Sequence, residues 1–209
     1  MSYENFLYDI ALRDDRLIVL TAENRAAIRN LPLKLGKRFI DTGITEQTMT
    51  GIAAGLALRG RIPVTHALAA FLTMRAFEFI RTDVGIPALP VKMVGGVAGF
   101  LSEANGPTHQ ALEDISIMRG IPNMNVFAPA DDEDMLIGLE TVLLSSQPCY
   151  IRYNNLKPAM QHNRSFQMGK AEMINDGEDI TIITYGMLLR QAYEAMIMPE
   201  TKGISVRLL

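Results

Sequence analysis

Short apolar runs alternate with longer segments of helical periodicity along most of the chain. Several of the short runs are apolar throughout, which is typical of strands buried on both faces of a sheet. They predict strands at 17–20, 38–41, 63–67, 91–94, 125–128 and 150–153. The longer segments predict helices at 4–13, 46–59, 72–84, 110–118 and 132–145.

Strands that alternate with helices predict an α/β fold with a mostly parallel sheet and helices on both faces. This first domain should span residues 1–155. Residues 156–178 are polar and poorly periodic and end near an Asp-Gly turn signal, so we interpret them as a linker. Residues 179–209 then predict strand, helix and strand, which is too little for a core and indicates an incomplete second α/β domain.

Composition narrows the functional classes without selecting one. The chain of 209 residues has a net charge of −3, no tryptophan and one cysteine. This balance argues against a nucleic-acid footprint or a basic membrane anchor, and a single cysteine excludes an intrachain disulfide. We expect a cytoplasmic protein with no metal site of its own, since His66, His109 and His162 show no metal-ligand spacing.

The stretch DTGITEQTMTGIAAGLALRG, residues 41–60, combines a helix start with unusual small residues. Thr42 or Thr45 is suited to cap the helix, and Glu46 in the first turn suits the helix dipole. Gly51 and Gly55 each cost about 1 kcal/mol relative to alanine inside a helix. We therefore expect this helix to pack tightly on a neighbour, for which a subunit interface is one place.

Three further features have both a structural and a functional interpretation. His109 follows a Gly-Pro turn at a helix start, where histidine is more often a cap or a surface group. Asp131 and Asp134 resemble a capping box, which we interpret as structural. Arg152 ends an apolar strand, where it is able to pair with a carboxylate or to hold a phosphate.

Four stretches together resemble the pyrimidine-binding domain of transketolases in order and in spacing. They are GITEQTMTGIAAGLALRG, AAFLTMRAF, GPTHQALEDISIMRGIPNMNVFAPAD and IRYNN, and the resemblance covers residues 15–155. The segment from residue 179 resembles the start of the transketolase C-terminal domain. The whole chain is similar to the C-terminal section of a split transketolase, so the resemblance implies the pyrimidine-domain fold of thiamin diphosphate enzymes.

The resemblance implies a cofactor role for Glu46. In this family the matching glutamate hydrogen-bonds N1′ of the aminopyrimidine of thiamin diphosphate, and the cofactor carries a two-carbon ketol unit between sugars. An apolar helix mouth would favour the protonated carboxyl that this role needs. The resemblance also places Phe71, Met74 and Phe77 in the aromatic pocket around the pyrimidine.

On the substrate side, some residues match the family pattern and others depart from it. His109 matches a catalytic histidine that faces the substrate, and Arg152 matches an arginine that holds the sugar phosphate. Asn105 stands where an aspartate is usual in the substrate site, Val97 where a histidine is usual, and Glu23 near a position where many members have serine. These departures concern sugar-phosphate specificity rather than cofactor binding.

One family motif is absent from the sequence. The diphosphate-binding domain of the family carries Gly-Asp-Gly and an asparagine that bind magnesium, and no Gly-Asp-Gly occurs here. We therefore expect a separate partner chain to hold magnesium and the diphosphate, in an α2β2 assembly that acts on small sugars. The alternatives are the beta subunit of a 2-oxo-acid dehydrogenase, 1-deoxyxylulose-phosphate synthase, or a non-catalytic homologue.

Overall fold

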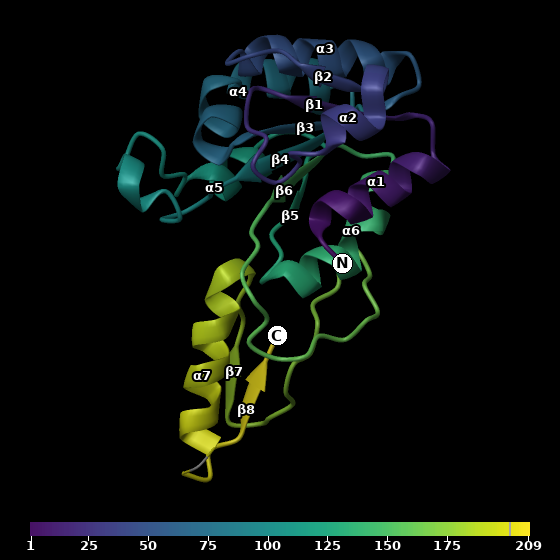
Figure 1. The fold of residues 1–209 in the computed structure, drawn as a ribbon. Coiled ribbons are helices and arrows are strands. Elements are labelled where there is room, and N and C mark those ends of the chain that lie inside the picture. The colour runs from purple at the N-terminus through teal and green to yellow at the C-terminus, as the bar shows by residue number, and fades with distance from the viewer. Residues whose placement is uncertain (201) are drawn as a thin grey trace. The chain divides into compact units, whose positions relative to one another are not determined.

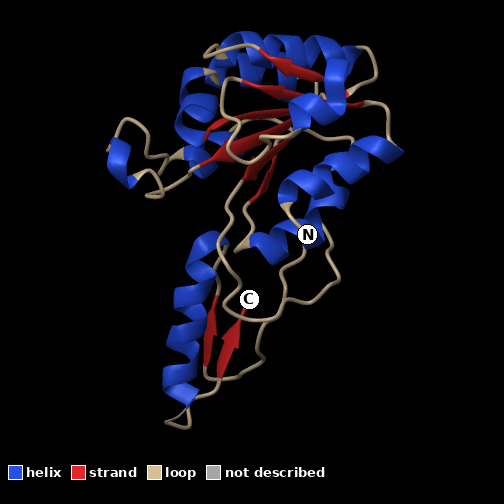
Figure 2. Cartoon of the chain, in the orientation of Figure 1, coloured by secondary structure: helices blue, strands red, loops and turns tan. Residues whose placement is uncertain are grey.

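The computed structural model describes residues 1–200 and 202–209. Figure 1 shows the helices and strands in chain order, and Figure 2 colours them by type. The contacts of the chain divide it into two compact units. The first unit comprises Met1–Phe127 and Val142–Tyr153, and the second comprises Ala128–Thr141 and Asn154–Leu209. The sequence pattern did not indicate that residues 128–141 belong with the C-terminal segment.

The first unit contains a six-stranded sheet in which every neighbouring pair is parallel. The strand order is β2-β1-β3-β4-β6-β5. The strands are β1 (Leu17–Thr21), β2 (Phe39–Asp41), β3 (Ile62–Leu68), β4 (Lys92–Gly96), β5 (Asn125–Phe127) and β6 (Cys149–Arg152). The predicted α/β class and parallel sheet are confirmed.

One helix precedes β1, and the others lie in the connections between these strands. They are α1 (Tyr3–Arg13), α2 (Leu31–Leu35), α3 (Glu46–Leu58), α4 (Phe77–Phe79), α5 (Asp114–Arg119) and α6 (Asp132–Leu144). Short 3₁₀ turns occur at Gly36–Arg38, Glu103–Asn105 and Gly186–Leu188. The chain moves one way along the sheet from β1 to β2, and the opposite way from β2 to β3 and from β3 to β4. Because parallel crossovers are right-handed, α2 lies on one face of the sheet, and α3 and α4 lie on the other.

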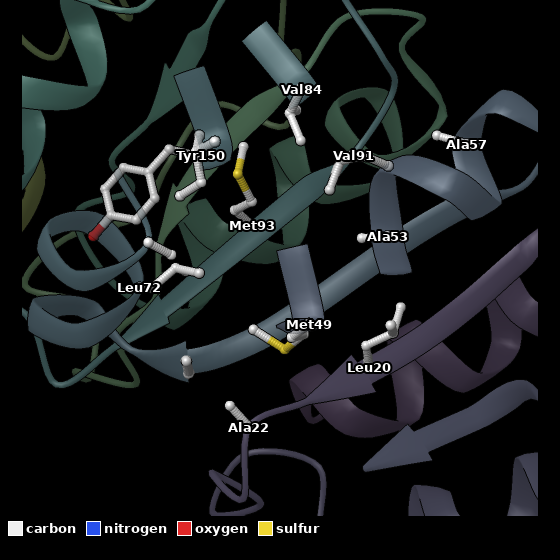
Figure 3. Packing of buried hydrophobic residues seen from close by; sticks show 14 of the residues in the cluster. Leu20, Ala22, Met49, Ala53, Ala57, Leu72, Val84, Val91, Met93 and Tyr150 are labelled. Carbon is white, nitrogen blue, oxygen red and sulfur yellow. The ribbon is translucent and has the colours of Figure 1, made fainter. Parts of the chain in front are cut away.

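The main core lies between α3 and the central strands. Met49, Ala53 and Ala57 recur at helical spacing on one side of α3 and are buried with Leu20 of β1 and Met93 of β4 (Figure 3). The burial of β1, β3 and β4 on both faces explains their unbroken apolar runs. The core therefore fixes α3 against the sheet and places its first residue at the carboxyl ends of the strands.

The predicted helix at 72–84 is not a regular α-helix. It consists of a π-helical segment at Phe71–Arg75, the short α4, and a second π-helical segment at Ile80–Gly85. The Thr73 hydroxyl donates to the Ala69 carbonyl oxygen over 2.7 Å, which is a side-chain bond of the kind that bends helices. A 3.6-residue periodicity does not distinguish this wider winding from an α-helix, and π-helical segments are frequent at functional sites.

The predicted helix at 110–118 begins only at Asp114. The residues before it form turns, and the Gly99 amide donates to the Ala111 carbonyl oxygen over 2.8 Å. This antiparallel bridge closes a loop that leaves β4 and returns to α5. The Ala111 carbonyl oxygen accepts a hydrogen bond from Gly99 in this bridge and is not part of a longer helix.

The second unit contains the predicted strand–helix–strand segment. Strands β7 (Ile180–Ile182) and β8 (Val206–Leu208) are parallel and are joined by α7 (Leu189–Glu200). Their small core also takes in Ala130 from the segment before α6. Within residues 1–200 and 202–209, no helix has the length and apolar character needed to cross a membrane.

Candidate functional site

Glu46 begins α3 directly after the loop that follows β2, and only 2% of its surface is exposed. The predicted side-chain cap is wrong, because Thr45 occupies the cap position without a capping hydrogen bond. Its hydroxyl donates instead to the Thr42 carbonyl oxygen over 2.9 Å, and the Thr42 hydroxyl donates to backbone carbonyls. The two threonines therefore shape the loop that leads to Glu46.

Arg75 is the partner of the buried Glu46 carboxylate. Its Nη1 atom donates to Oε2 of Glu46 over 2.9 Å, and the Arg75 side chain is 40% exposed. The apolar helix mouth expected around Glu46 therefore also contains a cation. Sequence reasoning missed Arg75 because the two residues are 29 positions apart, and local spacing does not relate them.

Arg75 also connects Glu46 with two other predicted site residues. The Arg75 guanidinium carbon lies 4.3 Å from the centre of the Phe71 ring. The Phe71 ring meets the His109 ring edge-on, with centroids 4.9 Å apart and planes inclined by 71°. Glu46, Arg75, Phe71 and His109 thus form one continuous series of contacts drawn from three chain segments.

The loop between β4 and α5 holds His109 in this series. The His109 amide donates to the Gly106 carbonyl oxygen over 3.1 Å, and the Thr108 hydroxyl lies 3.0 Å from Nδ1 of His109. Gly106 has a φ of +71°, a conformation that glycine adopts without steric cost. The Gly-Pro-Thr-His sequence therefore forms a turn that directs the histidine toward Phe71.

Arg152 forms a buried ion pair with Asp114. Its Nε atom donates to Oδ2 of Asp114 over 2.8 Å and its Nη2 atom to Oδ1 over 3.2 Å, and only 14% of the Arg152 side chain is exposed. The Tyr150 hydroxyl also donates to Asp114 over 2.7 Å; burial, together with the nearby Asp114 charge, raises the pKa of Tyr150. Of the two interpretations of Arg152, pairing with a carboxylate is confirmed.

The same arginine supports the His109 loop. Nη2 of Arg152 donates to the Ala111 carbonyl oxygen over 3.2 Å, and this oxygen also accepts from the Gly99 amide. Arg152 therefore anchors the bridge that closes the loop two residues after His109. Its side chain acts on the site through the backbone of Ala111.

The remaining predicted residues lie around this series. Phe77 is half-buried and packs against the main core, while Met74 is 43% exposed. Asn105 is exposed, and its side-chain amide donates to the Ser102 hydroxyl over 3.0 Å. The structure brings Glu46, Phe71 and His109 into one contact series and leaves Met74 and Asn105 on the surface.

The other two histidines have structural contacts. His66 accepts from or donates to the Tyr3 hydroxyl over 2.8 Å, and burial lowers the pKa of His66 to about 4. His162 lies between Asp131 and Glu172, each 2.9 Å away. Within the described part of the chain, no group of three or more His, Cys, Asp or Glu residues is arranged to hold a metal ion.

Gly51 and Gly55 lie on an open side of α3. A methyl group added at either glycine would meet no other part of the chain within 4 Å, apart from chain neighbours and the helix's own backbone. The neighbour on which this helix was expected to pack is therefore not supplied by the described chain at Gly51 and Gly55, and packing at a subunit interface stays a prediction. Ile52 and Leu58 of the same helix are 37% and 71% exposed.

Comparison with known proteins agrees with this architecture. The transketolase pyrimidine-binding domain family matches residues 2–158, and the transketolase C-terminal domain family matches residues 169–209. The 6-deoxy-6-sulfo-D-fructose transketolase subunit SqwH of Clostridium sp. (strain MSTE9) is 36% identical over 100% of this chain and 66% of its own length. A putative transketolase C-terminal section of Methanocaldococcus jannaschii is 33% identical over 99% of this chain and 67% of its own length.

Solved structures show the same fold. A split gene transketolase, described as an inactive beta4 tetramer, superposes with a TM-score of 0.87 at 32% identity, covering 99% of this chain and 68% of that one. A transketolase from Leishmania mexicana superposes with a TM-score of 0.81 at 22% identity, covering 98% and 32%, which shows the fold alone. The chain spans about two thirds of the length of the split relatives that it matches. From its pyrimidine-binding domain and the start of its C-terminal domain, this chain belongs to the transketolase family.

Proposed function

We propose that this chain is one subunit of a split, thiamin diphosphate-dependent transketolase that transfers a two-carbon ketol unit between sugars. The observation that carries the proposal is the buried Glu46 carboxylate at the mouth of α3, connected to the Phe71 ring and to His109. Relatives with the same section are described as subunits of transketolases for 6-deoxy-6-sulfo-D-fructose and for apulose-4-phosphate. This similarity supports an enzymatic role within the family.

The residues present fit the pyrimidine half of the cofactor. A buried carboxylate is a strong hydrogen-bonding group for a ring nitrogen, and an aromatic face binds a planar heterocycle by stacking. Glu46 and Phe71 supply these two groups within one contact series. Met74 and Phe77 come from the same segment and stay in the proposed pocket.

Each residue has a defined task in this proposal. When bound, thiamin diphosphate supplies the nucleophilic carbon that takes up the ketol fragment. Glu46 holds or exchanges a proton at N1′ of the pyrimidine, and its burial keeps water from competing for the carboxylate. His109 faces the sugar and moves protons at its oxygens, and Asn105 hydrogen-bonds the sugar. Arg152 keeps the His109 loop in place, and we retain a contact with a substrate phosphate as part of its proposed role.

The site needs a second chain in this proposal. We assign magnesium and the diphosphate to a separate subunit and infer an α2β2 assembly with the cofactor at the interfaces. The open side of α3 with Gly51 and Gly55 supports this inference, since a surface of small residues lets a neighbouring backbone approach closely. A split gene transketolase described as a beta4 tetramer supports self-association of this chain as part of the proposal.

Reconstitution tests the proposal. The chain is mixed with a separate subunit that carries the Gly-Asp-Gly diphosphate-binding domain, together with thiamin diphosphate and magnesium. The mixture is assayed for ketol transfer from phosphorylated, unphosphorylated and sulfonated ketoses. We expect transfer from at least one ketose to an aldose. Turnover of a 2-oxo acid without any ketol transfer would instead identify the beta subunit of a 2-oxo-acid dehydrogenase, and no turnover would identify a non-catalytic homologue.

Glu46→Gln provides the residue-level test in the same assay. Glutamine keeps the size of the side chain but cannot exchange a proton with the pyrimidine, so we expect turnover to fall by about 10²- to 10⁴-fold. Glu78→Gln removes an exposed carboxylate from a neighbouring segment and serves as the matched control. Near-normal turnover of Glu46→Gln would remove Glu46 from the mechanism.

A further inference from the structure

The Arg75 guanidinium touches both groups that the proposed function reserves for the pyrimidine. One nitrogen donates to Oε2 of Glu46 over 2.9 Å, and the central carbon lies 4.3 Å from the centre of the Phe71 ring. Arg75 therefore combines in one side chain the stacking contact and the carboxylate contact.

The chemistry of a guanidinium suits this double contact. It is planar and delocalised, it presents N–H donors to a carboxylate, and it binds the face of an aromatic ring. An aminopyrimidine is likewise planar, has nitrogen at its edge and stacks on aromatic rings. The Arg75 guanidinium and an aminopyrimidine are thus both suited to hydrogen-bond the Glu46 carboxylate and to stack on the Phe71 ring.

Burial explains why Glu46 needs such a partner within the chain. Glu46 is 2% exposed, and a buried carboxylate without a partner is strongly unfavourable. Arg75 supplies the opposite charge, while its own side chain remains 40% exposed. Releasing Arg75 therefore moves a partly hydrated cation into water, which costs less than releasing a buried one.

We propose that Arg75 is a positioning residue that occupies the pyrimidine place in the free chain and must leave Glu46 and Phe71 when the cofactor binds. The inference rests on the proposed function for the identity of the ligand. Its consequence is a competition: Arg75 keeps Glu46 ordered in the free chain and lowers the affinity of the site for the aminopyrimidine.

Thiamin is the probe for this competition. It carries the aminopyrimidine without the diphosphate, so its binding does not require the diphosphate site of another chain. We would titrate the full chain with thiamin and follow binding by ligand-observed NMR, with circular dichroism to verify the fold of each variant. We expect Arg75→Ala to bind thiamin about tenfold more tightly than the wild type.

Three variants sharpen the interpretation. Arg75→Lys keeps the charge without the planar fork, so its affinity should lie between those of wild type and Arg75→Ala. Arg81→Ala removes the same charge from an exposed position in the following segment and should bind like the wild type. Glu46→Gln combined with Arg75→Ala should lose the gain, because the carboxylate that binds the pyrimidine is gone.

Equal or weaker thiamin binding by Arg75→Ala and Arg75→Lys, or binding by none of the variants, would overturn the inference. A gain that persists in the Glu46→Gln background would also overturn it. The outcome is separable from the proposed function. Tighter thiamin binding without ketol transfer in the reconstituted assembly would uphold the role of Arg75 and refute the transketolase activity.

Discussion

At the scale of single residues, the sequence predicts the place of Glu46 but not its partner. Its position in the first turn of a glycine-containing helix made it a candidate site residue, and in the structure it is buried there. Its partner Arg75 carries no signal in the sequence, because nothing in local spacing relates a helix start to a cation in a later segment.

His162 is the second residue whose role the sequence left open. It lies in the segment that we interpreted as a linker, yet it is buried in the second unit with Asp131 and Glu172 at its two ring nitrogens. Burial disfavours its charge, but the hydrogen bonds to Glu172 and Asp131, with the charges of Asp131 and Asp134, raise the pKa of His162 to about 9. The His162 imidazolium therefore forms an ion pair between residues 156–178 and Asp131, which directly precedes α6.

This pKa predicts a pH dependence of stability. Because the pKa of His162 is raised from 6.5 to about 9 on folding, its contribution is complete below pH 6.5 and is lost as the pH rises through 9. The loss should amount to about 2–3 kcal/mol in the free energy of unfolding. Urea unfolding between pH 6 and 10 measures it, and His162→Gln should lack this decline.

Lys92 must be considered in that measurement because it acts in the opposite direction. Burial lowers the pKa of Lys92 to about 8, so its effect on stability rises with pH above that value. Both proteins contain Lys92, and the difference between wild type and His162→Gln therefore isolates the histidine. Identical pH profiles for the two proteins would contradict a charged His162.

At the scale of secondary-structure elements, two departures from the predicted pattern concern the site. The segment 71–85 contains two π-helical stretches around the short α4, and the segment before Asp114 forms a bridged loop instead of a helix. Hydrophobic periodicity predicts that such segments exist and which residues they bury. It does not predict their exact winding, which depends on side-chain bonds such as that of Thr73 and on long-range bridges.

The ion pair between α5 and β6 gives a prediction at this scale. Arg152→Leu leaves the buried Asp114 with only the Tyr150 hydroxyl among its side-chain partners, so we expect the free energy of unfolding to fall by about 3–5 kcal/mol. Combining it with Asp114→Asn should recover part of that loss, because the uncompensated charge is removed. Urea unfolding of the single and double variants measures both effects.

Arg119→Leu is the matched control, since Arg119 is an exposed arginine in the last turn of α5. It should change the free energy of unfolding by less than about 0.5 kcal/mol. If Arg152→Leu lowers the free energy of unfolding as little as Arg119→Leu does, the pair with Asp114 contributes little to stability.

At the scale of the whole molecule, the open side of α3 is the feature that this chain does not explain by itself. Two helical glycines meet no part of the chain other than their own helix and chain neighbours within 4 Å, beside exposed apolar side chains. The chain also spans only about two thirds of its split relatives. The open side of α3 is therefore the surface on which we propose that a neighbouring chain packs.

Gly55→Ala separates folding from association. Alanine favours a helix over glycine by about 1 kcal/mol, and the added methyl group has open space in this chain, so the single chain should become more stable. If a neighbouring backbone packs on this surface, the same methyl group should weaken the assembly. Chemical unfolding measures the first effect, and light scattering on the chain with and without its partner subunit measures the second. Unchanged association would place the interface elsewhere.

The fold class, the order of most strands and helices, and the place of Glu46 at the start of a helix follow from the sequence alone. These properties follow from local periodicity, from turn residues such as Gly106, and from the family pattern carried by short motifs. Three ion pairs are visible only in the folded chain: Arg75 with Glu46, Arg152 with Asp114, and His162 with Asp131. The partners are 29, 38 and 31 positions apart in the sequence, so their pairing depends on how the sheet and the loops pack and not on local spacing.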